Sequence, residues 1–94
     1  MVTKEEEESR KAIAKVLRTL RYSIHPIFII TKSKSNIIFH PNKCDIDESI
    51  DEATISNKKN RDMIIYLQYN DIRKIQVLLA NRNHTVFDLT DWKQ

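Results

Sequence analysis

The sequence contains no glycine, and this absence excludes several kinds of site from the chain. Phosphate-binding loops and nucleophile elbows need glycine, because the backbone there adopts conformations that a Cβ atom hinders. The sequence therefore predicts neither a nucleotide-binding loop nor a hydrolase elbow. Positive φ angles must come from other residues, and asparagine tolerates them best. The candidates are Asn36, Asn42, Asn57, Asn60, Asn70, Asn81 and Asn83.

Cysteine and long apolar runs are also scarce. The single cysteine, Cys44, has no partner for an internal disulfide, which is typical of a reducing compartment. Residues 1–9 carry four consecutive glutamates where a secretory signal would have an apolar run. The apolar run Ile27–Ile30 is far too short to span a membrane. We therefore expect an intracellular protein, cytoplasmic or nuclear, with no membrane partner.

The chain has 94 residues, of which 40% are hydrophobic and 31% charged. This composition is that of a globular protein, and the length allows one domain over residues 1–94. A chain of this size buries only a modest core. We therefore expect that a second copy or another protein adds to its stability.

Residues 4–21 carry the clearest pattern, which predicts an amphipathic helix. Thr3 followed by Glu6 is a capping-box pair, and the glutamates of the first turn suit the positive end of the helix dipole. Apolar residues then recur at the spacing of one helical face. These are Ile13, Val16, Leu17 and Leu20.

Residues 26–40 predict a β-hairpin. The runs Ile27–Thr31 and Asn36–Phe39 are rich in β-branched and aromatic residues, and a polar tetrapeptide separates them. The first run is apolar on both faces, which predicts a central strand covered by the helix. Pro41 ends the second run.

Residues 44–60 change from acidic to basic, and we expect them to form a loop. Ile46, Ile50 and Ala53 lie at helical spacing, so a short helix is an alternative. A third strand is predicted at Met63–Leu67, just after a basic stretch.

The rest of the stretch 61–92 allows two interpretations. Asn70 with Asp71 is a helix-start signal, which favours a helix over 70–81 and gives strand–helix–strand. Ile75, Val77 and Leu79 also fit an alternating strand, which gives a β-meander. Residues 85–90 predict the last strand, with Trp92 anchoring the tail.

Under the strand interpretation, Met63–Leu89 faintly resembles the β-meander of pleckstrin-homology-like domains, with residues 69–72 at a turn between strands. The fold class that we predict is α+β, with an N-terminal amphipathic helix packed on a small antiparallel sheet in the order α-β-β-β-α-β. The alternative is a pleckstrin-homology-like meander preceded by a helix.

Candidate metal and catalytic constellations are weak. A calcium loop starting at Asp45 would need glycine where Ile50 stands and glutamate where Ser56 stands. The histidines and Cys44 lack the paired spacing of zinc ligands, and a Cys–His pair would also need an orienting group and an oxyanion hole. We therefore predict that the protein is not an enzyme and that it has no catalytic residues, metal site or cofactor.

The charges are segregated along the chain, which indicates a binding function. One hypothesis is a protein-interaction module, a homodimer or a subunit of a complex, in which an acidic patch or a free sheet edge meets the partner. The acidic residues are Asp45, Asp47, Glu48, Asp51 and Glu52. The alternative is a nucleic-acid-binding domain that contacts phosphates through a basic helix face and hairpin turn. Its residues are Lys11, Lys15, Arg18, Arg21, Lys32 and Lys34.

Overall fold

The computed structural model describes residues 3–90. Over this range one helix, α1 (Lys4–Leu20), is followed by seven strands. The strands are β1 (Ile27–Thr31), β2 (Ile37–Phe39), β3 (Cys44–Glu48), β4 (Glu52–Asn57), β5 (Ile64–Gln68), β6 (Ile72–Leu78) and β7 (Asn83–Asp88). Two 3₁₀ turns, η1 (Pro41–Lys43) and η2 (Tyr69–Asp71), join β2 to β3 and β5 to β6. The predicted α+β class is confirmed.

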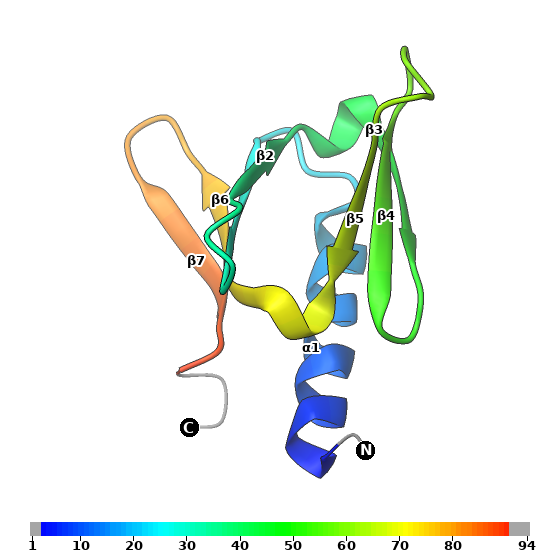
Figure 1. The fold of residues 1–94 in the computed structure, drawn as a ribbon. Coiled ribbons are helices and arrows are strands. Elements are labelled where there is room, and N and C mark those ends of the chain that lie inside the picture. Colours follow the sequence, from blue (N-terminus) through cyan, green and yellow to red (C-terminus); the bar gives the residue numbers. More distant parts are fainter. Residues whose placement is uncertain (1–2, 91–94) are drawn as a thin grey trace.

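The strands form two antiparallel sheets that face one another (Figure 1). The first has the order β2-β1-β6-β7 and the second the order β3-β4-β5. Because η1 and η2 each lead from one sheet to the other, the two sheets are connected at two corners. The chain thus forms two sheets where one small sheet was predicted, and the order of its elements differs from the predicted α-β-β-β-α-β.

A single apolar core holds the helix and both sheets together. Leu17 of α1, Ile29 of β1, Ile55 of β4 and Ile75 of β6 are almost completely buried within it. The helix contacts β3, β7 and η2, so its apolar stripe covers parts of both sheets. Apolar burial of this kind stabilises a fold by about 25 cal/mol per Å² removed from water.

The predicted helix and hairpin are both confirmed. The Thr3 side chain caps α1 by accepting a hydrogen bond from the Glu6 amide at 3.1 Å. In the hairpin, β1 pairs with β2 from Ile27↔Phe39 to Ile29↔Ile37, and β1 is an inner strand because β6 pairs along its other side. Local sequence patterns sufficed here because each element is defined by neighbours in the chain.

The expectation that asparagines supply positive φ angles is wrong for the described residues. Lys34, in the turn between β1 and β2, has a φ of 66°, and it is the one such residue within 3–90. Asparagine side chains act instead as acceptors that close turns. The Asn57 carboxamide oxygen accepts hydrogen bonds from the Lys59 and Asn60 amides at 2.8 and 3.1 Å.

The expected loop or short helix over 44–60 is wrong as well. Residues Cys44–Glu48 and Glu52–Asn57 form the hairpin β3–β4, with a turn in which the Ser49 amide donates to the Glu52 carbonyl at 2.8 Å. Ile46 is buried while Asp47 beside it is exposed, so the period is two. Ile50, which suggested helical spacing, lies exposed in the turn.

The helix predicted over 70–81 is a strand, β6. It pairs with β1 on one side and β7 on the other, and these two ladders outweigh a weak helix-start signal. The start signal instead belongs to η2, where the Asp71 carboxylate accepts hydrogen bonds from the Ser33 amide and hydroxyl at 3.0 and 2.7 Å. The alternative prediction, a continuous meander, is also wrong, because β5 and β6 lie in different sheets and do not pair. Trp92 lies outside the described residues.

Candidate functional site

Strand β5 has a free edge whose backbone groups point away from its neighbour. It pairs with β4 and with no other strand in the described part of the chain. Two backbone bonds fix its orientation, one from the Asn57 amide to the Met63 carbonyl and one from the Tyr69 amide to the Asp51 carbonyl. Along an antiparallel strand, the backbone N–H and C=O groups of successive residues point alternately to one side and the other. In β5 the backbone groups of the odd-numbered residues therefore point toward β4. The N–H and C=O groups of Ile64, Tyr66 and Gln68 therefore face the open edge.

The side chains at this edge are apolar and exposed. Tyr66 is 66% exposed and Ile64 is 43% exposed. Leu67, the next residue after Tyr66, is buried in the core. The strand Ile64–Gln68 contains no charged residue. Natural sheet edges usually carry lysine, proline or inward-pointing charges that prevent pairing with another chain. The β5 edge has none of these protections.

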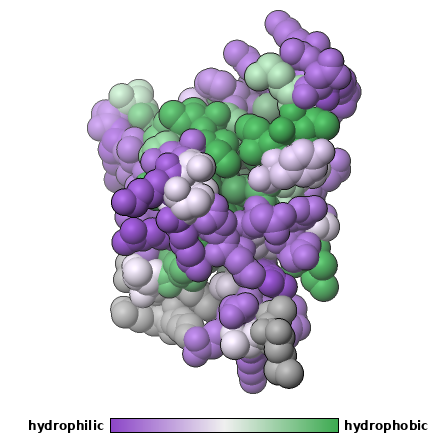
Figure 2. All heavy atoms as spheres, in the orientation of Figure 1, coloured by the Kyte–Doolittle hydropathy of each residue, from purple (hydrophilic) through white to green (hydrophobic). Residues whose placement is uncertain are grey.

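An apolar groove adjoins the N-terminal end of β5. Ile38 of β2 lines it together with Met63 and Ile64, and the charged residues Lys43 and Asp62 also contribute to the lining. Ile38 and Met63 are both more than half exposed. Figure 2 shows hydrophobic residues gathered in a band across this face of the molecule, above a more hydrophilic region. Apolar surface that is contiguous in this way is typical of an interaction site.

The other sheet edges within residues 3–90 differ from β5. Edge strand β3 carries Asp45, Asp47 and Glu48, and edge strand β2 has three residues. Edge strand β7 begins with a polar run, Asn83–Thr85. Charged, short or polar edges resist strand addition more than an uncharged apolar one. The β5 edge is therefore the best candidate interaction surface.

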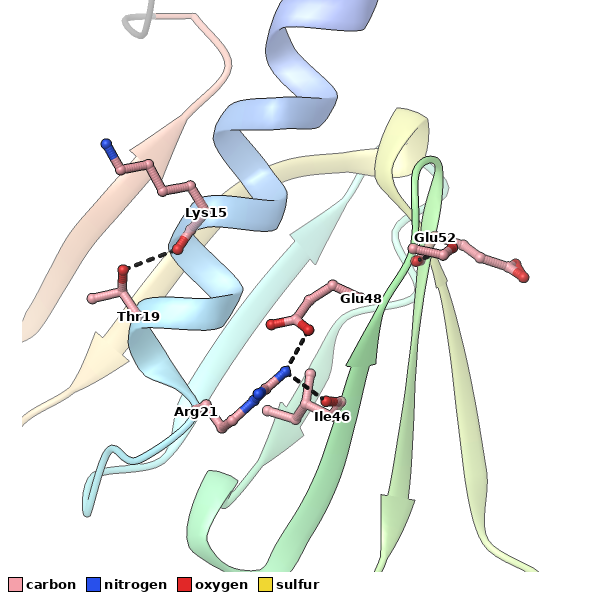
Figure 3. Close-up of polar contacts among 7 residues, drawn as sticks. Lys15, Thr19, Arg21, Ile46, Glu48 and Glu52 are labelled. Atoms are coloured by element: carbon pink, nitrogen blue, oxygen red, sulfur yellow. Dashed lines mark hydrogen bonds and ion pairs between the residues drawn. The ribbon is translucent and has the colours of Figure 1, made fainter.

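The predicted basic residues do not form one free surface. Arg21 forms an ion pair with Glu48 and donates a second hydrogen bond to the Ile46 carbonyl at 3.1 Å (Figure 3). Lys11 lies 3.6 Å from the Glu7 carboxylate, on the exposed face of α1. Lys32 lines a hollow together with glutamates from the first turn of α1. Lys15, Arg18 and Lys34 are exposed. Nucleic-acid binding stays a prediction.

The predicted acidic residues are also divided. The Asp45 carboxylate pairs with the Arg61 guanidinium at 2.7 Å, and the Glu52 carboxylate accepts a hydrogen bond from the Gln68 amide group at 2.6 Å. Glu48 forms an ion pair with Arg21, at the end of α1, and the Glu48 side chain is 9% exposed. Asp47 and Asp51 remain exposed. The acidic residues thus do not form one free patch, and two of their five charges, those of Asp45 and Glu48, are balanced within the chain.

A buried polar cluster joins α1 to the second sheet. Glu48, Arg21 and Tyr69 each have one buried side-chain atom without a hydrogen-bond partner in the described protein, namely Glu48 Oε1, Arg21 Nε and the Tyr69 hydroxyl. Burial, and next the negative charge of Glu48, raises the pKa of Tyr69 to about 12. The Tyr69 hydroxyl therefore stays protonated near neutral pH.

The features expected of a nucleophilic or metal site are weak in the described residues. Burial, and next the charge of Asp45, raises the pKa of the Cys44 thiol, and a raised pKa means less of the reactive thiolate at neutral pH. Residues 3–90 bring together no cluster of three or more histidine, cysteine, aspartate or glutamate side chains suited to a metal ion. Within the same range, no helix combines the length and apolarity needed to cross a membrane.

No family model, curated protein or solved structure matches this chain. The chain is a small α+β domain with an uncharged, exposed sheet edge at β5.

The position of β5 is predictable from the sequence, but its exposure is not. The predicted strand Met63–Leu67 nearly coincides with β5, and its lack of charge is visible in the sequence. An uncharged run also suits an inner strand, however, so the sequence cannot tell that Ile64 and Tyr66 lie at an edge. Pairing between distant segments decides which strands are at the edges.

Proposed function

We propose that this protein is a non-enzymatic interaction module that binds an extended polypeptide segment as an additional strand beside β5. The observation that carries the proposal is the free backbone edge of Ile64, Tyr66 and Gln68. An added strand satisfies these N–H and C=O groups, and main-chain hydrogen bonds of this kind supply affinity in strand addition.

The side chains beside the edge support an apolar, uncharged partner segment. Ile64 and Tyr66 share the outer face of β5, and cross-strand pairs of aromatic and β-branched residues each contribute about 0.2–1 kcal/mol. The groove next to Ile38 and Met63 offers further apolar contact for a side chain at one end of the segment. Charged residues opposite Ile64 and Tyr66 would lose hydration without gaining an opposite charge, because the strand Ile64–Gln68 is uncharged.

The test is a nuclear magnetic resonance titration of ¹⁵N-labelled protein with a short, capped peptide of alternating threonine and valine. We expect shift changes and slowed hydrogen exchange at the amides of Ile64, Tyr66 and Gln68. A matched peptide, methylated on the backbone nitrogens that would face β5, keeps every side chain but cannot form the ladder. Equal binding of both peptides would contradict strand addition.

Two substitutions at one position separate the backbone from the side chain. Tyr66→Pro removes an N–H that faces the open edge, and proline is tolerated in edge strands where that N–H faces solvent. Tyr66→Ala removes the ring and keeps the N–H. We expect the proline variant to lose peptide binding and the alanine variant to retain a weaker form of it. A proline variant that binds as well as the unmodified protein would overturn the proposal.

A further inference from the structure

The strand that fits the β5 edge best is β5 of a second copy. This inference rests on the function proposed above and names its partner. We infer that two copies pair β5 with β5 in antiparallel orientation, with Tyr66 of each copy opposite Tyr66 of the other across a two-fold axis. The backbone of β5, the charges at its two ends and the outer edges of the resulting sheet all favour this pairing.

The backbone of β5 supports this register. The outward-facing residues are Ile64, Tyr66 and Gln68. Antiparallel pairing centred on Tyr66 places Ile64 opposite Gln68 and Gln68 opposite Ile64, so each outward-facing residue of one copy meets one of the other. Hydrogen-bonded pairs then form at all of these positions. A register centred on Ile65 instead leaves Gln68 beyond the partner's strand.

The charges at the two ends of β5 are opposite in sign. Three basic residues and one acidic residue precede the strand, namely Lys58, Lys59, Arg61 and Asp62, and Arg61 is already paired with Asp45 of its own copy. Three acidic residues lie at its other end: Asp71 follows the strand, the Asp51 carbonyl accepts from the Tyr69 amide, and Glu52 binds Gln68. Antiparallel pairing brings the basic end of each copy beside the acidic end of the other. Parallel pairing would bring like charges together, which is unfavourable.

Antiparallel pairing of β5 with β5 also limits the assembly to two copies. It joins two three-stranded sheets into one continuous sheet whose outer strands are the two copies of β3. Each outer strand carries Asp45, Asp47 and Glu48, and charged edges discourage further strand addition. A two-fold contact between identical surfaces therefore stops at a dimer rather than growing into a fibre.

The test is sedimentation equilibrium of the whole chain over a wide range of concentrations, with charge changes at Tyr66. We expect the unmodified protein to form dimers. Tyr66→Lys places two positive charges face to face across the axis, and we expect the dimer dissociation constant to rise about tenfold or more. Lysine is common at sheet edges and Tyr66 is exposed, so the monomer should keep its fold, as circular dichroism and thermal unfolding will show.

A mixing experiment makes the test specific to this register. Tyr66→Lys and Tyr66→Glu variants, each weakened alone, should form a mixed dimer when combined, because the two side chains then attract across the axis. Thr85→Lys, an exposed position on β7, is the matched control and should leave the dimer unchanged. A dimer that tolerates Tyr66→Lys, or variants that do not restore each other, would place the contact elsewhere.

Self-pairing of β5 and strand addition by other segments predict different experimental results. A protein that stays monomeric at every concentration, yet binds the threonine–valine peptide at β5, would overturn the self-pairing and leave the proposed function intact. A protein that stays monomeric and does not bind the peptide would overturn both. A dimer that blocks peptide binding at β5 would support both, because the two strands would compete for one edge.

Discussion

The Arg21 guanidinium and the Glu48 carboxylate form an ion pair that joins the end of α1 to β3 (Figure 3). Arg21 also donates to the Ile46 carbonyl, so one side chain holds two positions of the same strand. The Glu48 side chain is nearly buried and the Arg21 side chain is about one-third exposed. Because a buried carboxylate without its cation is costly, this contact fixes where the helix lies on the second sheet.

Removing Arg21 should therefore destabilise the fold. We expect Arg21→Ala to lower the free energy of unfolding by about 2 kcal/mol, below the value for a fully buried pair because solvent reaches the guanidinium. Urea unfolding of Arg21→Ala, Glu48→Ala and the double variant measures this loss and the coupling energy. Arg18→Ala, one turn earlier and exposed, is the control and should change stability by about 0.5 kcal/mol or less. Additive losses would contradict a direct contact.

Tyr69 should ionise far above the usual range for tyrosine, with a midpoint at about pH 12. Burial is the larger cause and the charge of Glu48 the next, so Glu48→Gln should lower the pKa of Tyr69 without restoring its ordinary value. An ultraviolet absorbance titration of tyrosine ionisation, compared with that of Tyr69→Phe, isolates this residue. A midpoint for Tyr69 near 10 would contradict its burial beside Glu48.

The raised pKa of Tyr69 also predicts how stability depends on pH. Between about pH 10 and pH 12 the unfolded chain loses this proton while the folded chain keeps it, so alkali favours unfolding. The contribution is fully present below pH 10, falls by about 1.4 kcal/mol per pH unit in that window, and levels off above it. The difference between the unmodified protein and Tyr69→Phe in urea unfolding at each pH isolates this term from the lysines.

At neutral pH, replacing Tyr69 by phenylalanine should be neutral or stabilising. The hydroxyl is buried with no partner within hydrogen-bond distance in the described protein, and the nearby Ser49 amide already donates to the Glu52 carbonyl at 2.8 Å. Removing the hydroxyl therefore relieves an unfavourable burial while the ring keeps its packing. We expect the free energy of unfolding to rise by up to about 1 kcal/mol. A loss of more than about 1 kcal/mol in urea unfolding at pH 7 would reveal a hydrogen bond to this hydroxyl.

The cap of α1 can be tested at Thr3. The Thr3 hydroxyl oxygen accepts from the Glu6 amide, and Thr3→Ala leaves that amide without its partner. We expect a loss of about 1 kcal/mol in thermal or urea unfolding. Thr3→Ser keeps the hydroxyl oxygen and serves as the control, with stability close to that of the unmodified protein. Equal losses for both variants would show that the methyl group, rather than the cap, matters.

Lys34 provides a site for stabilisation. Its φ of 66° lies in the left-handed region, where a Cβ atom costs about 1 kcal/mol or more. We expect Lys34→Gly to raise the free energy of unfolding by about 0.5–1 kcal/mol, after allowance for the greater entropy of glycine in the unfolded chain. Ser35→Gly, at the neighbouring position without a positive φ, should be destabilising in the same unfolding assay.

Local signals predicted the elements that neighbouring residues define. Thr3 and the apolar stripe through Leu17 predicted α1, and two β-branched runs around Lys34 predicted the first hairpin. Elsewhere the same signals misled. Ile50 lay at helical spacing with Ile46 and Ala53, yet it is exposed in a turn, because the alternation that mattered was buried Ile46 beside exposed Asp47.

The candidate site was predicted only in part. The sequence placed a strand at Met63–Leu67 and suggested a free sheet edge as one route to binding. It could not tell that β5 is that edge, nor that Glu48 is buried against Arg21 instead of lying on an acidic surface. Both facts depend on contacts between segments far apart in the chain.

By itself, the sequence determined the class of the fold, the capped helix and the first hairpin, because these follow from spacing over a few residues. The tertiary structure decided that residues 72–78 form a strand, since β1 and β7 offer ladders on both sides that outweigh the helix start at Asn70. It also decided which backbone groups stay unpaired. An edge is defined by the strand that is missing beside it, and no local pattern within β5 contains that information.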